Sequence, residues 1–247
     1  MLAGLIAGLI AGCGTSAPRT ALPAPAANEP VVTQCPAWLN AQQRGEGRLY
    51  QVDAQASAVR IHVFRGGRLS SLGHNHVLGA ERLAGQAFVP QQGLQDAGVE
   101  LSLRLEDLAI DKPEWRAGLG PEFASQPSES DIAGTRTNMM RALDGARYPA
   151  LVMQSRSVKG AWPVLALRLA VQWHGHTREM DLPLRAAQPA GDGPLRAQGR
   201  LVLRQSDFGI TPFAVLNGLI AIQDELVAEV DITARPAATC AALSPAG

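Results

Sequence analysis

Aromatic residues and surplus charge are both scarce in this sequence. Phe, Trp and Tyr make up 4% of the 247 residues, and 22 basic residues balance 22 acidic ones. A protein that binds nucleic acid needs a basic surface for the phosphates, and single-strand binders add aromatic side chains that stack on the bases. Because the chain lacks both features, we expect no nucleic acid partner.

Recognisable catalytic motifs are also missing. The chain has no Gly-x-Ser-x-Gly elbow and no glycine-rich phosphate-binding loop after a strand. Asp53, Glu106, Asp107 and Asp111 are scattered, as expected for solvated ends of strands. We therefore predict that the protein is not an enzyme and requires no cofactor. A hydrolase is the alternative, since folding and not sequence order assembles a His, Asp and Ser set.

The first residues predict export. Residues 1–12 form an apolar run that ends at Cys13; it is shorter than the roughly 20 residues that span a bilayer and fits the apolar core of a signal peptide. Residues 9–13 resemble a bacterial lipobox, in which the cysteine is lipidated. No Lys or Arg precedes the run. We predict a bacterial periplasmic lipoprotein whose lipid anchor at Cys13 holds it on a membrane, with a buried N-terminal helix as the alternative. The absence of Asp directly after Cys13 favours the outer membrane over the inner one.

Composition divides the chain into four parts. We predict a signal peptide over residues 1–13, a flexible tether over residues 14–47, one β-barrel domain over residues 48–236 and a C-terminal tail over residues 237–247. The tether is assigned because its Pro- and Ala-rich sequence offers little that can pack into a core.

Strict alternation of apolar and polar residues predicts a domain built mainly of strands. Four segments alternate clearly, at residues 99–106, 165–173, 180–185 and 226–233, and shorter runs lie at residues 57–65, 83–90, 150–158 and 195–204. Alternation gives a strand one buried and one wet face, with Glu100 and Ser102 on the wet face. About eight antiparallel strands of this kind form either a sandwich or a closed barrel.

The cysteines favour the closed barrel. An up-and-down barrel pairs its first strand with its last, so the start of one lies beside the end of the other. Cys35 precedes the first predicted strand and Cys240 follows the last, and an even pair of cysteines in an exported protein indicates a disulfide. Two free thiols are the alternative. A barrel of about eight strands can enclose one small ligand.

One helix and one corner interrupt the strands. Residues 128–131 fit a capping box at a helix start, and a long loop is the alternative. Apolar residues then recur near helical spacing at Ile132, Met139, Met140 and Leu143. Gly145 and Pro149 are expected to end the helix. Residues 204–210 predict a tight structural corner whose Phe208 fills the core.

Histidine spacing raises a metal-binding alternative. The chain contains two His-x-His pairs, His74 with His76 and His174 with His176. On a strand, both histidines of such a pair lie on the same face. Each pair could supply two imidazoles to one ion, and two pairs together would complete a tetrahedral site. The competing interpretation is that these side chains cap turns or bond backbone carbonyls, because Gly73 precedes one pair.

Leu, Val, Ile and Met are expected to line the interior of the barrel. Such a lining suits an apolar ligand, and a solidly filled core is the alternative. The alternating positions that we expect on the interior wall are Leu101, Leu103, Leu167, Leu169, Val171, Leu201 and Leu203.

Several segments together resemble the YceI-like family of bacterial polyisoprenoid-binding proteins. The matching pieces, in order, are residues 49–61, the Gly-His-Asn-His motif at residues 73–76 that marks one branch, Tyr148–Pro149, residues 174–184 and residues 204–210. The resemblance implies a lipocalin-like eight-stranded antiparallel barrel in the periplasm. It also implies an apolar lipid partner in the interior, such as an isoprenoid quinone or polyprenyl lipid, that is carried, stored or sensed.

The chain departs from the family pattern at residues 111–145, where it has a longer insertion. We expect this insertion to form a lid. The sequence indicates no oligomeric state.

Overall fold

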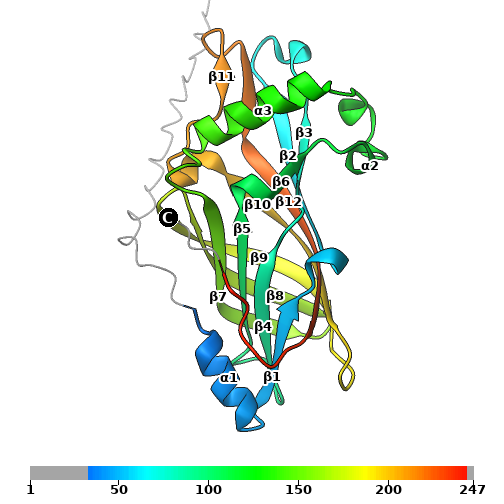
Figure 1. The fold of residues 1–247 in the computed structure, drawn as a ribbon, viewed down its shortest axis with the longest axis vertical. Coiled ribbons are helices and arrows are strands. Elements are labelled where there is room, and N and C mark those ends of the chain that lie inside the picture. Colours follow the sequence, from blue (N-terminus) through cyan, green and yellow to red (C-terminus); the bar gives the residue numbers. More distant parts are fainter. Residues whose placement is uncertain (1–32, 244–247) are drawn as a thin grey trace, which may run out of the picture.

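Residues 33–243 are described by the computed structural model, and within them each alternating segment of the sequence forms a strand (Figure 1). The strands are β1 (Gly47–Val52), β2 (Ala58–Gly66), β3 (His76–Ala80), β4 (Ala84–Pro90), β5 (Gly98–Arg104), β6 (Leu108–Ile110), β7 (Ala150–Ala161), β8 (Val164–Trp173), β9 (His176–Ala187), β10 (Leu195–Arg204), β11 (Ala214–Val215) and β12 (Ile220–Pro236). The α-helices are α1 (Cys35–Gln43), α2 (Pro113–Arg116) and α3 (Glu129–Ala142).

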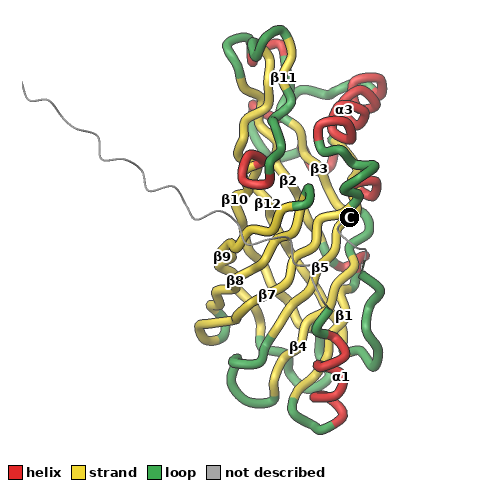
Figure 2. The backbone as a smooth tube through the Cα atoms, turned by 90° about the vertical axis from the view of Figure 1, so that its left-hand side faces the viewer, coloured by secondary structure: helices red, strands yellow, loops and turns green. Residues whose placement is uncertain are grey.

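The strands close into a meander barrel. Each of the first three long strands is broken once, so that β1 continues as β2, β3 as β4 and β5 as β6. Together with β7, β8, β9, β10 and β12 they form eight antiparallel staves, which Figure 2 shows wrapping around one interior. The last stave closes the barrel on the first, since β12 pairs with β2 and, through Tyr50 and Pro236, with β1. The predicted lipocalin-like closed barrel is confirmed.

The terminal segments form a clasp on the outer wall, defined here as residues 33–43 together with residues 237–241. A disulfide joins Cys35 to Cys240, with their Cα atoms 5.9 Å apart, and this is the pairing that the sequence analysis favours. The Trp38 ring stacks on Phe88 at 6.3 Å between centroids. The predicted tether is therefore wrong from residue 33 onward, because Cys35 and Trp38 bury themselves against the barrel.

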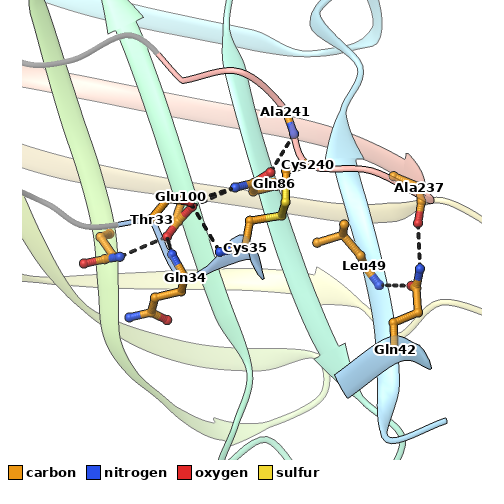
Figure 3. Close-up of a disulfide and its surroundings, with 11 residues drawn as sticks. Thr33, Gln34, Cys35, Gln42, Leu49, Gln86, Glu100, Ala237, Cys240 and Ala241 are labelled. Atoms are coloured by element: carbon orange, nitrogen blue, oxygen red, sulfur yellow. Dashed lines mark hydrogen bonds between the residues drawn. A yellow bond between two sulfur atoms is a disulfide. The ribbon is translucent and has the colours of Figure 1, made fainter. Parts of the chain in front are cut away.

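The clasp covers polar side chains that alternation places on the wet face. Glu100 is fully buried, and its carboxylate accepts hydrogen bonds from Thr33 Oγ1 at 2.8 Å, from Gln86 Nε2 at 2.7 Å, from Gln154 Nε2 at 2.9 Å and from the backbone N–H of Gln34 (Figure 3). The expectation of a solvated Glu100 is wrong because the N-terminal segment lies over it.

The C-terminal part of the clasp is anchored in the same way. The backbone N–H of Ala241 donates to Gln86 Oε1 at 2.8 Å, and Gln42 Nε2 donates to the carbonyl of Ala237 at 3.0 Å. Residues 237–241 are thus held by the barrel wall and by α1, and this part of the predicted tail is not free.

Helix α3 starts as its sequence predicts. Ser128 is the N-cap, its hydroxyl accepts from the backbone N–H of Asp131, and the Asp131 side chain accepts from the backbone N–H of Ser128. This reciprocal capping box satisfies backbone donors that would otherwise be unpaired at the helix start. The helix crosses the upper end of the barrel in Figure 1.

The predicted corner after β10 is also present. Residues 205–208 form a 3-10 turn, Phe208 is fully buried, and Gly209 takes a left-handed φ of 69°. A Cβ atom at Gly209 would lie 2.7 Å from Nε2 of His176, so both the backbone conformation and the close approach require glycine.

Within residues 33–243, no helix is long and apolar enough to cross a membrane.

Candidate ligand-binding site in the barrel

The lower part of the interior, toward α1, contains a cavity of about 140 Å³. Every residue that lines this lower cavity is Gly, Ala, Val, Leu, Ile, Met, Phe or Trp. The structure places six of the predicted interior positions on its wall, namely Leu101, Leu103, Leu167, Leu169, Leu201 and Leu203. Val171 is fully buried in the same apolar core but does not line the cavity. The interior is therefore hollow and not solidly packed.

The lower cavity has partly exposed apolar residues at its rim. Leu94 lies in the loop between β4 and β5, Trp162 in the turn between β7 and β8, and Leu195 at the start of β10. All three are half-buried while the leucines deeper on the wall are buried. Their position at the ends of neighbouring strands marks this rim as the accessible side of the lower cavity.

A second cavity of about 140 Å³ lies under α3. Thr135, Asn138, Met139 and Ala142 line this upper cavity, and their spacing puts them on one face of the helix. The opposite wall includes Trp173 at the end of β8. The insertion between β6 and β7 therefore covers the upper cavity as a lid, in the way the sequence predicts.

The two cavities share a waist. Ile61, Leu103, Leu151 and Leu203 line both of them. An apolar cavity of about 150 Å³ holds one benzene ring, so two such spaces in line match a narrow chain on the order of a dozen carbon atoms.

One polar cluster borders the upper cavity. His76 Nδ1 lies 2.6 Å from Asp111 Oδ2, and Arg116 Nη1 lies 2.5 Å from Asp111 Oδ1, which also accepts from the backbone N–H of Val77 at 2.8 Å. Arg116 donates as well to the carbonyl of Asn75 at 2.8 Å. The prediction of a solvated Asp111 is wrong, because its side chain is fully buried among these donors.

The same donors control the charge of Asp111. Burial by itself raises the pKa of this carboxyl, but the hydrogen bonds from His76 and Val77 and the charges of His76 and Arg116 outweigh burial and hold the pKa below its usual range. Asp111 also has a left-handed φ of 54°, which is unusual for a residue with a Cβ atom. A strained, buried and fully bonded carboxylate is a feature of functional sites.

The histidine pairs are used separately. His74 is exposed while His76 binds Asp111, and His174 forms part of the turn before β9, where its Nδ1 lies 3.1 Å from the carbonyl of Phe208. Burial lowers the pKa of His176. Among residues 33–243, no three His, Cys, Asp or Glu side chains are grouped so as to hold a metal ion. The structure therefore does not assemble the four-histidine site of the metal-binding alternative.

The alternation in the sequence reveals the interior leucines, but no pattern in the sequence reveals the polar cluster. Asp111 and His76 are 35 residues apart, and both stand in segments where exposed polar residues are common. The one local signal is that Asp111 directly follows the apolar strand β6, which does not reveal the direction of its side chain.

Comparison with known proteins identifies the fold. No family model matches the sequence, and no curated protein matches it. The crystal structure of Burkholderia cenocepacia BcnA has a TM-score of 0.53 and 12% identity, and the match covers 74% of this chain and 98% of that one. At this identity the likeness shows a shared fold alone.

Two further solved structures come from Campylobacter jejuni. They are a YceI protein and a mutant of it with a monobromobimane guest, with TM-scores of 0.43 and 0.45 and 10% identity each. Each match covers 64% of this chain and 83% of the other.

Proposed function

We propose that this protein is a YceI-like binding protein that holds an isoprenoid or similar apolar lipid inside its barrel. The observation that carries the proposal is the lower cavity, a hollow interior whose wall is apolar throughout. Ligand sites are concave and mainly apolar, and a wall whose single hydrogen-bonding side chain is the indole of Trp162 selects a hydrocarbon chain. The shared fold with BcnA and the sequence resemblance to the YceI-like family support the same conclusion.

The energetics favour a chain over a compact ligand. Each CH₂ group moved from water into the cavity contributes about 0.8 kcal/mol, so a chain of about a dozen carbons gains about 10 kcal/mol. Association and the ordering of a flexible chain offset a large part of that gain. Affinity is therefore set by how much of the chain fits on both sides of the waist.

We further propose that the protein works outside the cytoplasm, anchored to a membrane through Cys13. The segment that carries this cysteine lies outside the described residues. An anchor of this kind keeps the barrel beside the bilayer, in which an apolar ligand is dissolved. Carriage, storage and sensing of the lipid all use the same barrel.

The first experiment asks whether the barrel carries lipid. The full-length protein is purified under gentle conditions, extracted with organic solvent, and the extract is analysed by mass spectrometry. We expect an isoprenoid or long-chain lipid at close to one equivalent. After lipid removal, calorimetric titration with farnesol is expected to show one site.

A variant at the waist tests where the ligand lies. Leu203→Trp places a large side chain at the waist, and we expect it to weaken farnesol binding about tenfold or more. Val202→Trp is the matched control, since the neighbouring Val202 is 54% exposed on the outer face, and it is expected to bind as the unmodified protein does. No lipid in the extract together with no farnesol binding would refute the proposed function.

A further inference from the structure

Two neighbouring turns at the lid end of the barrel expose large apolar side chains. One joins β2 to β3 (residues 67–73), the other comprises β11 and the turn before β12 (residues 214–219), and both reach above α3 in Figure 1. The backbone N–H of Leu69 donates to the carbonyl of Leu219 at 2.8 Å, so the two turns are in contact. We call them together the leucine tip. Five of the eight large apolar residues that are exposed within residues 33–243 lie on it, namely Leu69, Leu72, Val215, Leu216 and Leu219.

Leu216 is unfavourable at its position for two independent reasons. Its side chain is 61% exposed, and its backbone has a left-handed φ of 51°. The following residues, Asn217 and Gly218, are also left-handed, but asparagine and glycine tolerate this conformation whereas leucine does not. Neither packing nor backbone preference therefore explains a leucine here. Strained residues cluster at functional sites, and grouped exposed apolar residues mark an interaction surface.

The charge of the leucine tip fits the surface of a lipid bilayer. Arg68 is exposed and is the one charged residue of the tip, which contains no acidic residue. Anionic lipids attract an arginine that lies close to the bilayer surface. Apolar side chains beside it gain free energy when they are buried at the boundary between head groups and acyl chains. The tip therefore combines the two terms that hold a protein surface on an anionic membrane.

A bilayer suits the leucine tip better than a protein partner does. The tip has 13 residues, whereas a specific protein interface uses about 20–30 residues on each side. The predicted anchor also allows the contact. Residues 14–32 separate Cys13 from the clasp, and an extended chain of that length spans about 65 Å. The longest strand, β12, has 17 residues and spans about 55 Å, so a protein anchored at Cys13 can bring its tip to the same membrane.

We propose that the leucine tip inserts into the surface of an anionic lipid bilayer and docks the barrel there by its lid end. Leu72 and Leu216, the most exposed leucines of the tip, enter the acyl boundary, and Arg68 binds the phosphates of the head groups. This contact is a second attachment in addition to the lipid anchor. The inference rests on the proposed function only because that function places the protein beside a membrane.

Docking by the leucine tip gives the barrel an orientation. Phe213 and Ile222, which flank the second turn of the tip, both line the upper cavity, and the backbone N–H of Ile222 donates to the carbonyl of Phe213 at 3.0 Å. The tip therefore continues directly from the wall of the upper cavity. With the tip in the bilayer, the lid end of the barrel lies at the membrane surface, and the lower rim at Trp162 points away from it.

A local fluorescent label tests whether the tip enters a bilayer. An environment-sensitive dye is attached to Leu216→Cys in full-length protein that also carries Cys13→Ser, since Cys35 and Cys240 are joined and do not react. The probe is vesicles of phosphatidylcholine and phosphatidylglycerol in equal parts, and we expect them to shift the emission to shorter wavelength. The matched control is Val164→Cys, because Val164 is 59% exposed and lies beside the lower rim. The dye at this position is expected to keep its emission.

Two variants measure the contributions of the leucine and the arginine, with the dye placed at Leu72→Cys on the first turn of the tip. Adding Leu216→Asn should raise the lipid concentration for half of the shift about tenfold, because one leucine no longer enters the bilayer. Arg68→Gln should raise it about fivefold, and the control Val164→Asn should not change it. Leu216→Asn should also raise the melting temperature by about 2–4 °C, because asparagine relieves the left-handed strain. A purely structural leucine would give a lower melting temperature.

The possible outcomes separate this inference from the proposed function. No shift at Leu216→Cys, or an equal shift at Val164→Cys, overturns docking by the tip. A shift that grows with protein concentration without vesicles also overturns it, since a second copy of the chain then covers the tip. An equal response to vesicles of phosphatidylcholine alone overturns the anionic surface.

Farnesol titration of the Leu216→Asn protein provides the remaining distinction. Leu216 lines neither cavity, so this variant is expected to bind farnesol as the unmodified protein does. Loss of docking with farnesol binding intact supports the leucine tip as a surface separate from the barrel interior. Docking by a protein that binds no farnesol refutes the proposed lipid-binding barrel and leaves the membrane contact standing.

Discussion

Replacing Glu100 by glutamine removes a carboxylate whose two oxygens each accept two hydrogen bonds. Oε1 accepts from Gln34 N–H and Gln154 Nε2, and Oε2 accepts from Thr33 Oγ1 and Gln86 Nε2. The new amide nitrogen meets two donors in either orientation, so two charge-assisted bonds are lost. Each bond of that kind contributes about 1.5–3 kcal/mol, and we expect Glu100→Gln to lower the free energy of unfolding by about 3–6 kcal/mol.

Urea denaturation followed by circular dichroism measures this loss. Glu106→Gln is the control, because Glu106 is an exposed carboxylate paired with Arg104 at 2.6 Å, and exposed pairs contribute about 0–1 kcal/mol. A loss at Glu100→Gln that is no larger than the control would show that the clasp does not depend on the buried carboxylate.

Three further changes test the clasp, the lid and the buried cluster. Cys35→Ser with Cys240→Ser opens a loop of 205 residues, and the chain-entropy relation gives a loss of about 5 kcal/mol; urea unfolding that matches the oxidised protein would contradict this. Ser128→Ala removes the N-cap of α3 and is expected to cost about 1 kcal/mol, seen as faster amide hydrogen exchange in the first turn; unchanged exchange would argue against a stabilising cap. Asp111→Asn removes a carboxylate whose folded pKa lies below its unfolded value, so its contribution is complete above about pH 4 and is lost as the pH falls through the folded pKa. The difference in melting temperature between the unmodified protein and Asp111→Asn should therefore shrink below about pH 4, and a constant difference would refute this sign.

The barrel and its lid are predictable because their signals are local. Alternation marks the buried face of a strand wherever one face meets the core, and the capping box at Ser128 depends on residues that are three apart. Alternation shows which face of a strand is buried, but not how far along the barrel axis each residue lies. Leu169 therefore lines the lower cavity while Val171, two residues further on the same strand, is buried in solid packing.

Apart from the disulfide, the contacts of the clasp and of the polar cluster are not predictable because they are long-range. Glu100 is buried by the segment around Thr33, which is 67 residues away in the sequence. Nothing in the alternating strand around Glu100 indicates that this segment lies over it. Asp111 has an equally ordinary neighbourhood in the sequence, and only folding brings His76 and Arg116 to it.

The link between Cys35 and Cys240 also decides how the molecule responds to mechanical force. Tension applied through chain outside these two residues runs across the covalent sulfur bridge and does not load the strands between them. The barrel strands lie between the two cysteines in the sequence, so they belong to a covalently closed loop that carries none of this tension. Once the bridge is reduced, the same pull first detaches the clasp from the barrel wall. It then reaches β1 and β12 at the Tyr50 and Pro236 pair and opens the barrel along the seam where its first and last staves meet.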